Sequence, residues 1–345
     1  MILLKLHKAV QFKTSQKALL IILTFICCGF LSLQAQSVAA RKNNVKPIST
    51  FSIVAHDSVS GELGIAVASR FFAVGSVVPW ARADIGAVAT QSFANTSFGW
   101  KGLDLMDKGL TPDEALKVLL RTDSDPQRRQ IGLVSADGKS ATYTGKLCNP
   151  WAGGRNGPGY AIQGNILAGE AVVTAMEKSY LNTEGTLADK IYAALIAGEA
   201  NGGDSRGKQS AALLVVKKDA GYGGFTDRAI DIRVDESAEP FKELGRLLQY
   251  AQMNYAWNEG WTLFTRDKYQ EALPHMERTA KLAPENPEVL YDLAVIRLAA
   301  GKKDEALEAL KKSVTLNPKL RKQAQGDSDL DALRDDPDFK KAVSE

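Results

Sequence analysis

Three short segments rich in Val, Ile and Ala follow one another closely in the first third of the chain. They cover about 50–56, 62–69 and 84–91, and polar or glycine-containing stretches separate them. Short runs of β-branched and small apolar residues between turn signals are typical of buried strands. The pattern therefore predicts a sheet whose first strand begins with Thr50.

A helix and a hairpin are predicted next. The helix covers about 100–121, where Thr111 offers an N-cap and is followed by a proline and two acidic residues. Two further strands, at 131–136 and 140–144, flank the turn-forming pair Asp137-Gly138. A helix followed by a β-hairpin is thus expected after the first three strands.

The segment from 149 to 164 is predicted to be a loop, because seven of its residues are Gly or Pro. Helical periodicity returns at 166–180 and 186–197, and strands are predicted again at 211–217 and 229–234. Strands, then two helices, then strands favour an α+β layered sandwich over alternating βαβ units.

Beyond about residue 239 the pattern becomes helical throughout, and an internal repeat appears. Lys268-Tyr269-Gln270-Glu271-Ala272-Leu273 aligns with Lys302-Lys303-Asp304-Glu305-Ala306-Leu307, and Leu282-Ala283-Pro284 aligns with Leu316-Asn317-Pro318. The offset is about 34 residues in both cases, which is the period of tetratricopeptide repeats. Two repeats are therefore expected, at about 253–286 and 287–320.

The residues of the first repeat fit that pattern. Gly260, Tyr269, Ala272 and Pro284 fall where it places a glycine, an aromatic residue, a small residue and a closing proline. The second copy carries Ala294 in place of the glycine.

Two repeats are fewer than the roughly three that usually stand alone. A helix at about 239–252 and the tail at 330–339 are therefore predicted to cap them. The repeats form either a peptide-binding groove or a structural brace or dimer contact, and the sequence leaves both interpretations open.

The first 35 residues differ from the rest. Four lysines precede an apolar run over 18–33, which ends near Ala35. A basic head, an apolar centre and a small residue at the end predict a secretory signal, and the run is shorter than the roughly 20 residues of a membrane span. We therefore expect an exported protein, periplasmic or secreted, although an uncleaved anchor stays open. The polar segment 36–49 is interpreted as a linker.

The charge of the whole chain comes from this signal. With 43 basic and 40 acidic residues the net charge is +3, but the signal holds four basic residues and no acidic one. The rest of the chain has 39 basic and 40 acidic residues and is close to neutral. Its net charge therefore gives no reason to expect nucleic-acid binding.

Neither a metal nor a cofactor is expected. His56 lacks companion ligands in the sequence, and the glycine run 153–159 lacks the Lys-Ser/Thr ending of a phosphate-binding loop. Cys148 alone follows the signal, so no internal disulfide is expected after cleavage.

Several ordered motifs resemble one bacterial family. They are Thr50-Phe51-Ser52-Ile53-Val54-Ala55, Ala73-Val74-Gly75 with Val78-Pro79-Trp80-Ala81, Gly86-Ala87-Val88-Ala89-Thr90-Gln91, and Gln163-Gly164-Asn165. They resemble the domain-of-unknown-function family numbered 1028, which is assigned to the N-terminal-nucleophile hydrolase superfamily. The resemblance covers about 50–235. It implies a four-layer αββα sandwich of two antiparallel sheets, here placed at 50–238, before a helical repeat domain at 239–345.

The resemblance implies that Thr50 is the nucleophile. In such hydrolases the first residue of the first strand attacks an amide carbonyl, and its own α-amine takes the proton. Removal of the signal would leave residues 36–49 ahead of Thr50, so activity requires a second cut between residues 49 and 50. Ser52, on the same face of the strand, is the second candidate. The alternative is that Thr50 simply opens a strand.

Neutral amides follow several strands. Gln91 and Asn165 are suited to stabilising an oxyanion, and Asn95 to recognising an amide. The alternative for each is a role in a turn or in backbone hydrogen bonding.

Charged residues near the predicted site are candidates for substrate binding. Arg70 resembles the arginine after the second strand of related hydrolases and could hold a carboxylate. Asp204 and Arg206 share one loop that could line the pocket. Structural ion pairs are the alternative for all three. Ala68 stands where the related proteases carry an acid, which puts a proteasome-like mechanism in doubt.

Two functions therefore remain open at this point. One is an exported amidohydrolase acting on an amide or small peptide bond, with repeats that contact a partner protein or a second copy. The other is a non-catalytic ligand- or peptide-binding protein built on an inactive hydrolase scaffold. A third, an envelope assembly factor dominated by its repeats, rests on the helical half alone.

Overall fold

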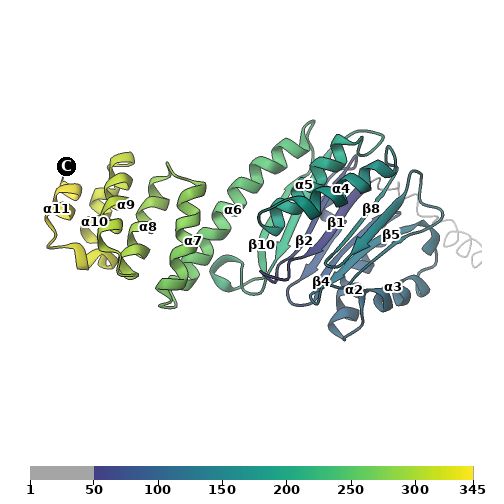
Figure 1. Ribbon diagram of the computed structural model, residues 1–345, viewed down its shortest axis with the longest axis horizontal. Helices are drawn as coiled ribbons and strands as arrows, with labels where there is room; N and C mark the ends of the chain where they lie inside the picture. The colour runs from purple at the N-terminus through teal and green to yellow at the C-terminus, as the bar shows by residue number, and fades with distance from the viewer. Residues whose placement is uncertain (1–49, 345) are drawn as a thin grey trace, which may run out of the picture. The chain divides into compact units, whose positions relative to one another are not determined.

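The computed structural model describes residues 50–344, so the predicted signal at 1–35 and linker at 36–49 lie outside the described residues. Two antiparallel sheets face each other (Figure 1). The six-stranded sheet has the order β10 (Arg228–Val234), β9 (Ser210–Val216), β2 (Leu63–Ser69), β1 (Thr50–His56), β8 (Tyr160–Asn165), β7 (Gly153–Gly157). The four-stranded sheet has the order β3 (Pro79–Arg82), β4 (Gly86–Ser92), β5 (Arg129–Ser135), β6 (Ser140–Thr144).

Strand β1 lies in the middle of the larger sheet and is buried on both faces. Phe51, Ile53 and Ala55 point toward the helices and join their core, whereas Val54 joins the core between the sheets. Because successive side chains of a strand alternate between faces, Thr50 and Ser52 lie on the inter-sheet side with Val54. The predicted common face of these two hydroxyl residues is confirmed.

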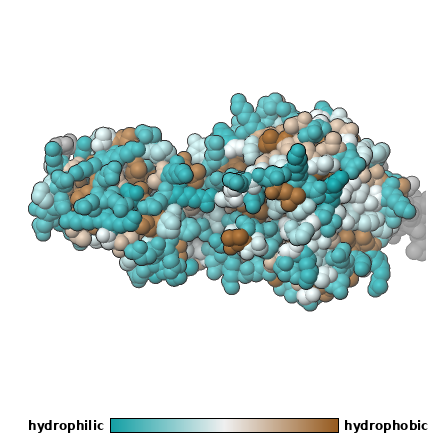
Figure 2. Space-filling model, viewed as in Figure 1, coloured by the Kyte–Doolittle hydropathy of each residue, from teal (hydrophilic) through white to brown (hydrophobic). Residues whose placement is uncertain are grey.

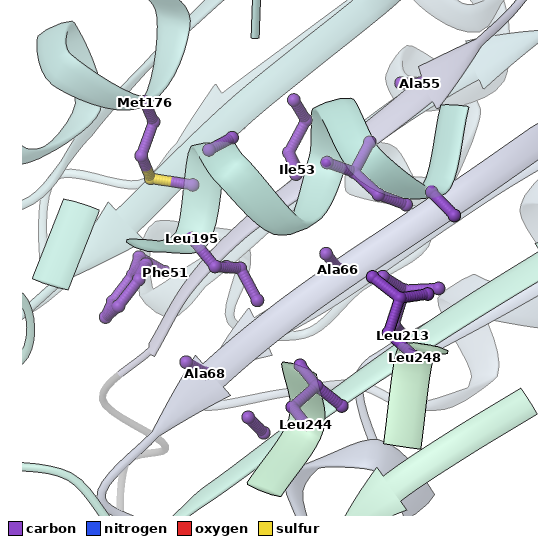
Figure 3. Close-up of a cluster of buried hydrophobic side chains, with 14 of the residues drawn as sticks. Phe51, Ile53, Ala55, Ala66, Ala68, Met176, Leu195, Leu213, Leu244 and Leu248 are labelled. Carbon is purple, nitrogen blue, oxygen red and sulfur yellow. The ribbon is translucent and has the colours of Figure 1, made fainter. Parts of the chain in front are cut away.

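Helices cover the outer face of each sheet. Helices α4 (Glu170–Asn182) and α5 (Leu187–Ala200) lie on the six-stranded sheet, and α2 (Ser97–Asp107) and α3 (Pro112–Arg121) on the four-stranded one (Figure 1). Figure 3 shows Met176 and Leu195 of these helices directed at the same core as Phe51 and Ile53 of β1. The predicted α+β sandwich is confirmed.

The predicted single helix at 100–121 is two helices. Gly109 adopts a φ of 89°, a left-handed conformation that glycine accepts most readily. Thr111 then starts α3 with a capping box, accepting a hydrogen bond from the Glu114 backbone N–H. The N-cap was correctly predicted, but it begins a new helix and does not lie inside a longer one.

The predicted loop at 149–164 is wrong, because it contains β7 and most of β8. Glycine serves here for close packing: a Cβ on Gly154 would lie 2.8 Å from the Ile162 carbonyl oxygen and 2.9 Å from Thr142 Oγ1. A composition that normally marks a turn thus marks a strand pressed against its neighbours.

Helix α6 (Pro240–Phe264) is one continuous helix of 25 residues, so the predicted cap at 239–252 does not end before the first repeat. Leu244 and Leu248 pack into the core of the sandwich beside Leu213 (Figure 3). Trp257 and Trp261, further along, pack against the core of the repeats. The same helix therefore completes two cores.

The repeats continue with α7 (Tyr269–Leu282), α8 (Pro287–Ala299) and α9 (Lys303–Leu316). Ala272 and Ala306 are fully buried, and Pro284 and Pro318 each follow the end of a helix by two residues. Both positions act as the repeat pattern predicts, since small residues allow close helix packing and proline cannot continue a helix.

The tail forms α10 (Leu320–Gly326), the 3₁₀ helix η4 (Ser328–Leu333) and α11 (Pro337–Ser344). Leu330, Leu333 and Phe339 join the core of the repeats, as expected of a cap. The face of the molecule in Figure 2 is mainly hydrophilic, with hydrophobic residues in small separate patches. Among the helices between residues 50 and 344, none has the length and apolar character needed to cross a membrane.

Candidate active site

Four polar residues form a row across one end of the six-stranded sheet. Asn165 of β8 and Ser69 of β2 lie directly opposite Thr50 on either side, and Ser210 of β9 lies opposite Ser69. Directly opposite residues of antiparallel strands share a face, so these side chains all point between the sheets. None is more than 2% exposed. The row therefore places polar chemistry in the interior, around the head of β1.

A second layer of buried polar groups lies beside this row. Ser52 Oγ donates a hydrogen bond to Gln91 Oε1 at 2.6 Å and accepts one from Gln163 Nε2 at 2.7 Å. Gln91 comes from β4 of the opposite sheet and Gln163 from β8, and all three residues are fully buried. The network thus connects the two sheets through hydrogen bonds, next to the apolar core that Val54 joins between them.

Gln130 of β5 is at the centre of this network. Its Oε1 accepts from Gln91 Nε2 at 2.9 Å and from Asn165 Nδ2 at 2.8 Å. Its Nε2 donates to the Gly164 carbonyl at 2.7 Å and to Thr144 Oγ1 at 2.9 Å. Gln130 is not among the site residues predicted from the sequence, although a glutamine near the start of a buried strand is a signal for a hydrogen-bonded polar group.

These contacts show what the predicted oxyanion donors do in the intact chain. Gln91 Nε2 also donates to the Thr50 carbonyl at 3.2 Å, and Asn165 Nδ2 donates to Gln130. The two amides therefore hold the start of β1 and the end of β8 in place. Their roles as oxyanion donors stay predictions.

The two candidate nucleophiles differ in their surroundings. Ser52 lies within the network, and its hydroxyl proton is engaged by Gln91. Thr50 lies at the strand start, and its Oγ1 donates to Ser69 Oγ at 3.3 Å. A cut before Thr50 leaves β1 complete, whereas a cut before Ser52 would remove the first two residues of the strand, so the geometry favours Thr50 over Ser52.

Arg70, Asp204 and Arg206 are brought together in one cluster. The buried Asp204 carboxylate accepts from the Arg70 backbone N–H at 2.8 Å and from the Arg206 guanidinium at 3.1 Å. Arg206 also donates to the Arg70 carbonyl at 3.1 Å, while the Arg70 guanidinium donates to the Arg206 carbonyl. The cluster matches the alternative of a structural ion pair, and substrate binding by its members stays a prediction.

The loop that carries Asp204 crosses the end of the sheet. Asp204 forms an isolated bridge with Leu167, and the Ser205 N–H donates to the Ile166 carbonyl at 3.0 Å, next to the end of β8. The Asp204 side chain reaches Arg70, just past the end of β2. Since β8 and β2 flank β1, this loop spans the two strands at the end where β1 begins.

Asn95 lies in a different cluster, in the loop between β4 and α2. Its Oδ1 accepts from the Ser97 N–H at 3.2 Å, and its Nδ2 donates to the Asp123 carboxylate at 2.7 Å. Arg129 pairs with the same carboxylate at 3.0 Å. Burial alone would raise the pKa of Asp123, but hydrogen bonds from Arg129 and Asn95 lower it below its ordinary value. Asn95 thus supports this loop, and its predicted role toward substrate is untested.

Gly132 leaves the space that the amide network occupies. A Cβ at this position would lie 2.0 Å from Gln163 Oε1. We expect Gly132→Ala to lower the free energy of unfolding by about 1–3 kcal/mol, since overpacking forces buried groups apart. Chemical denaturation measures this. Gly326→Ala is the matched control, because a Cβ there meets nothing within 4 Å. Equal stability of the two variants would contradict a rigid network.

Residues 50–344 contain no group of three or more His, Cys, Asp or Glu side chains that could hold a metal ion. Cys148 is buried, and burial raises the pKa of its thiol, which disfavours the reactive thiolate. The side chains in the row at the head of β1 are hydroxyl and amide groups, and the charged cluster of Arg70, Asp204 and Arg206 lies at the same end of the sheet.

Comparison with known proteins identifies both parts of the chain. The chain belongs to the family of unknown function DUF1028, whose sequence profile matches residues 50–244. A tetratricopeptide repeat profile matches residues 263–335. Both resemblances seen in the sequence are thereby confirmed.

The solved structures agree with this assignment. A DUF1028 protein from Silicibacter pomeroyi, known from its crystal structure, is 29% identical with a TM-score of 0.55, and the match covers 61% of this chain and 90% of that one. MamA is 21% identical over 29% of this chain and 67% of its own, and its TM-score of 0.22 supports no structural conclusion. No protein with a curated description matches the chain.

Proposed function

We propose that this protein is an exported amidohydrolase of the N-terminal-nucleophile type that acts on an amide or small peptide bond after processing at Thr50. The observation that supports this most is the place of Thr50. It is the first residue of a central strand, with its hydroxyl directed between the sheets beside Ser69 and opposite Asn165. A cut before residue 50 would put a primary amine and a hydroxyl on the same residue at that point.

The reaction would proceed in two stages. Thr50 Oγ attacks the substrate carbonyl carbon, and its proton passes to the α-amine, whose pKa is near 8. The tetrahedral intermediate collapses as the C–N bond breaks, and the leaving amine takes that proton. Water then gives a proton to the α-amine and attacks the ester; the C–Oγ bond breaks, and Thr50 Oγ regains its proton as the acid departs.

The amides near Thr50 already make hydrogen bonds in the intact chain, and this decides how they could take part. Asn165 lies directly opposite Thr50, but its Nδ2 donates to Gln130 Oε1. Stabilising the oxyanion requires that an N–H of this amide be directed to the substrate, either in exchange for that hydrogen bond or through the second N–H of the same group. Gln91 supports the reaction differently, since its hydrogen bond to the Thr50 carbonyl holds the nucleophile in register.

N-terminal sequencing of the exported protein tests the proposal. We expect the chain isolated from the periplasm or medium to begin at Thr50 and to hydrolyse small amides. An active preparation that begins upstream of residue 50 would contradict the mechanism. A chain found only in the cytoplasm would contradict export separately, because export rests on the N-terminal sequence pattern alone.

A second candidate is a non-catalytic binding protein. It is favoured by the complete burial of Thr50 in the intact chain and by the way the amides around it bond to one another. In this alternative the sandwich is a scaffold, and the repeats bind a partner protein. An exported chain that keeps residues 36–49 and has no hydrolase activity would support it.

A further inference from the structure

A cavity of about 670 Å³ lies away from Thr50, where the sandwich meets helix α6. One wall is β10 with the loop at 220–223, and the other is α6, with Asp292 contributed by α8. Its charged side chains are Asp292 and the ion pair of Arg228 with Asp231. Its larger side chains are mainly aromatic and aliphatic, among them Tyr222, Ile230, Ile232, Trp257 and Trp261. An apolar cavity with a few polar groups directed into it is the usual form of a ligand site.

Asp292 is the principal charged group on the helical wall. Its Oδ2 accepts hydrogen bonds from the indole N–H groups of both Trp257 and Trp261, each at 2.7 Å. These tryptophans are four residues apart on α6 and so share one helix face. The three side chains form a fixed unit in which two indole rings surround one carboxylate.

Both hydrogen-bond donors to the Asp292 carboxyl group are neutral indole N–H groups, so neither brings a positive charge to it. Burial raises the pKa of Asp292, the indole hydrogen bonds lower it, and the neighbouring acids Asp327 and Glu288 raise it further. Of the charged residues that line the cavity, Arg228 and Asp231 pair with each other, which leaves the Asp292 carboxyl as the group that would attract an incoming positive charge.

The wall from the sandwich is also held in place. The Asn258 side chain accepts from the Gly223 N–H at 2.9 Å and donates to the Gly221 carbonyl at 2.8 Å, which ties the loop to α6. Asp231 is engaged by Arg228 and Arg233 on the sandwich side. Asp292 is therefore the acidic side chain of the cavity that has no cationic partner among its hydrogen bonds, and Tyr222, which is 87% exposed, lines the same cavity.

We propose that this cavity binds a lysine or arginine side chain of a partner peptide, with the cation paired to Asp292 and lying against the indole rings of Trp257 and Trp261. Cations are attracted to the faces of tryptophan rings, and the attraction grows when water is excluded. A nearby carboxylate adds Coulomb attraction at low effective dielectric. The aliphatic stem of the bound residue would contact Ile230 and Ile232 on the opposite wall.

Calorimetric titration of the full chain tests this. The probes are a capped pentapeptide, acetyl-Gly-Ala-Lys-Ala-Gly-amide, and the same peptide with Nε-acetyllysine or glutamate at the centre. We expect the lysine peptide to bind at least about tenfold more tightly than the other two, a difference of about 1.4 kcal/mol. Equal binding of the three peptides, tighter binding of a neutral or acidic one, or no measurable binding of the lysine peptide would overturn the proposal.

Variants then assign the effect to Asp292. Asp292→Asn keeps an oxygen that can accept from both indoles but removes the charge, so we expect a correct fold and at least about tenfold weaker binding. Asp304→Asn, at an exposed position of α9, is the matched control and should bind like the wild type. Thr50→Ala should also bind normally, because the cavity is separate from the proposed nucleophile. Unchanged binding by Asp292→Asn would overturn the proposal whatever the outcome for amide hydrolysis.

Discussion

Replacing Thr50 with alanine lowers amide hydrolysis by the processed protein at least about 10³-fold, since removal of a nucleophile from a concerted catalytic group has effects of this size or larger. The fold is expected to persist, because the substitution removes only a hydroxyl and a methyl group from the polar row and leaves the apolar cores intact. Initial rates on a chromogenic amide measure the hydrolysis, and circular dichroism measures whether the fold persists. Thr50→Ser keeps the hydroxyl and should retain a substantial share of the activity.

Processing must be separated from catalysis in this experiment. If the chain cuts itself, Thr50→Ala will also keep its leader, and sequencing will show an N-terminus before residue 50. An engineered protease site ahead of residue 50 then removes the leader from both proteins. A processed Thr50→Ala protein that hydrolyses amides at the wild-type rate would exclude Thr50 as the nucleophile.

Replacing Asp123 with alanine destabilises the protein by about 3–5 kcal/mol, the range expected when one partner of a buried ion pair is removed. The Asp123 side chain is 2% exposed and its partner Arg129 is 16% exposed. The substitution also leaves Asn95 Nδ2 and the Asp125 N–H without their acceptor. Asp335→Ala is the control, since that side chain is fully exposed and should change stability by less than about 0.5 kcal/mol. Similar losses in both variants would contradict this assignment.

The same carboxylate gives a pH dependence of known sign. The pKa of Asp123 in the folded protein lies below its ordinary value of 3.8. The unfolded chain therefore takes up a proton first, and the stabilisation is complete above that ordinary pKa. It is lost as the pH falls through the lower, folded value. Denaturation midpoints measured from neutral pH into this acidic range should fall more steeply for the wild type than for Asp123→Ala.

Strand β1, the hairpin around Asp137-Gly138 and the two repeats follow from the sequence because each has a local cause. β-branched residues favour extended backbone, Asp-Gly favours a tight turn, and the 34-residue offset repeats one packing unit. The prediction of a loop at 149–164 was wrong at β7, because its glycines provide room for a neighbouring strand. Composition alone cannot distinguish that use of glycine from its use in turns.

For the candidate site too, the features with a local cause could be predicted and those that depend on packing between the sheets could not. Thr50 and Ser52 could be placed on one face because strand alternation is local. The part played by Gln130 could not be foreseen, since its partners Gln91 and Asn165 come from β4 and β8 and meet it only when the two sheets pack. The joining of Arg70 to Asp204 likewise depends on contacts across more than a hundred residues.

Because α6 contributes side chains to both cores, neither part of the protein is complete without it. Truncation of the chain before α6 would remove Leu244 and Leu248 from the core of the sandwich. Truncation after α6 would expose Trp257 and Trp261 to water. Replacing the repeats with another module would therefore have to retain α6, or supply a helix whose two ends carry apolar side chains for the two cores. A sandwich separated from its repeats would therefore need another apolar element at the place where Leu244 and Leu248 pack.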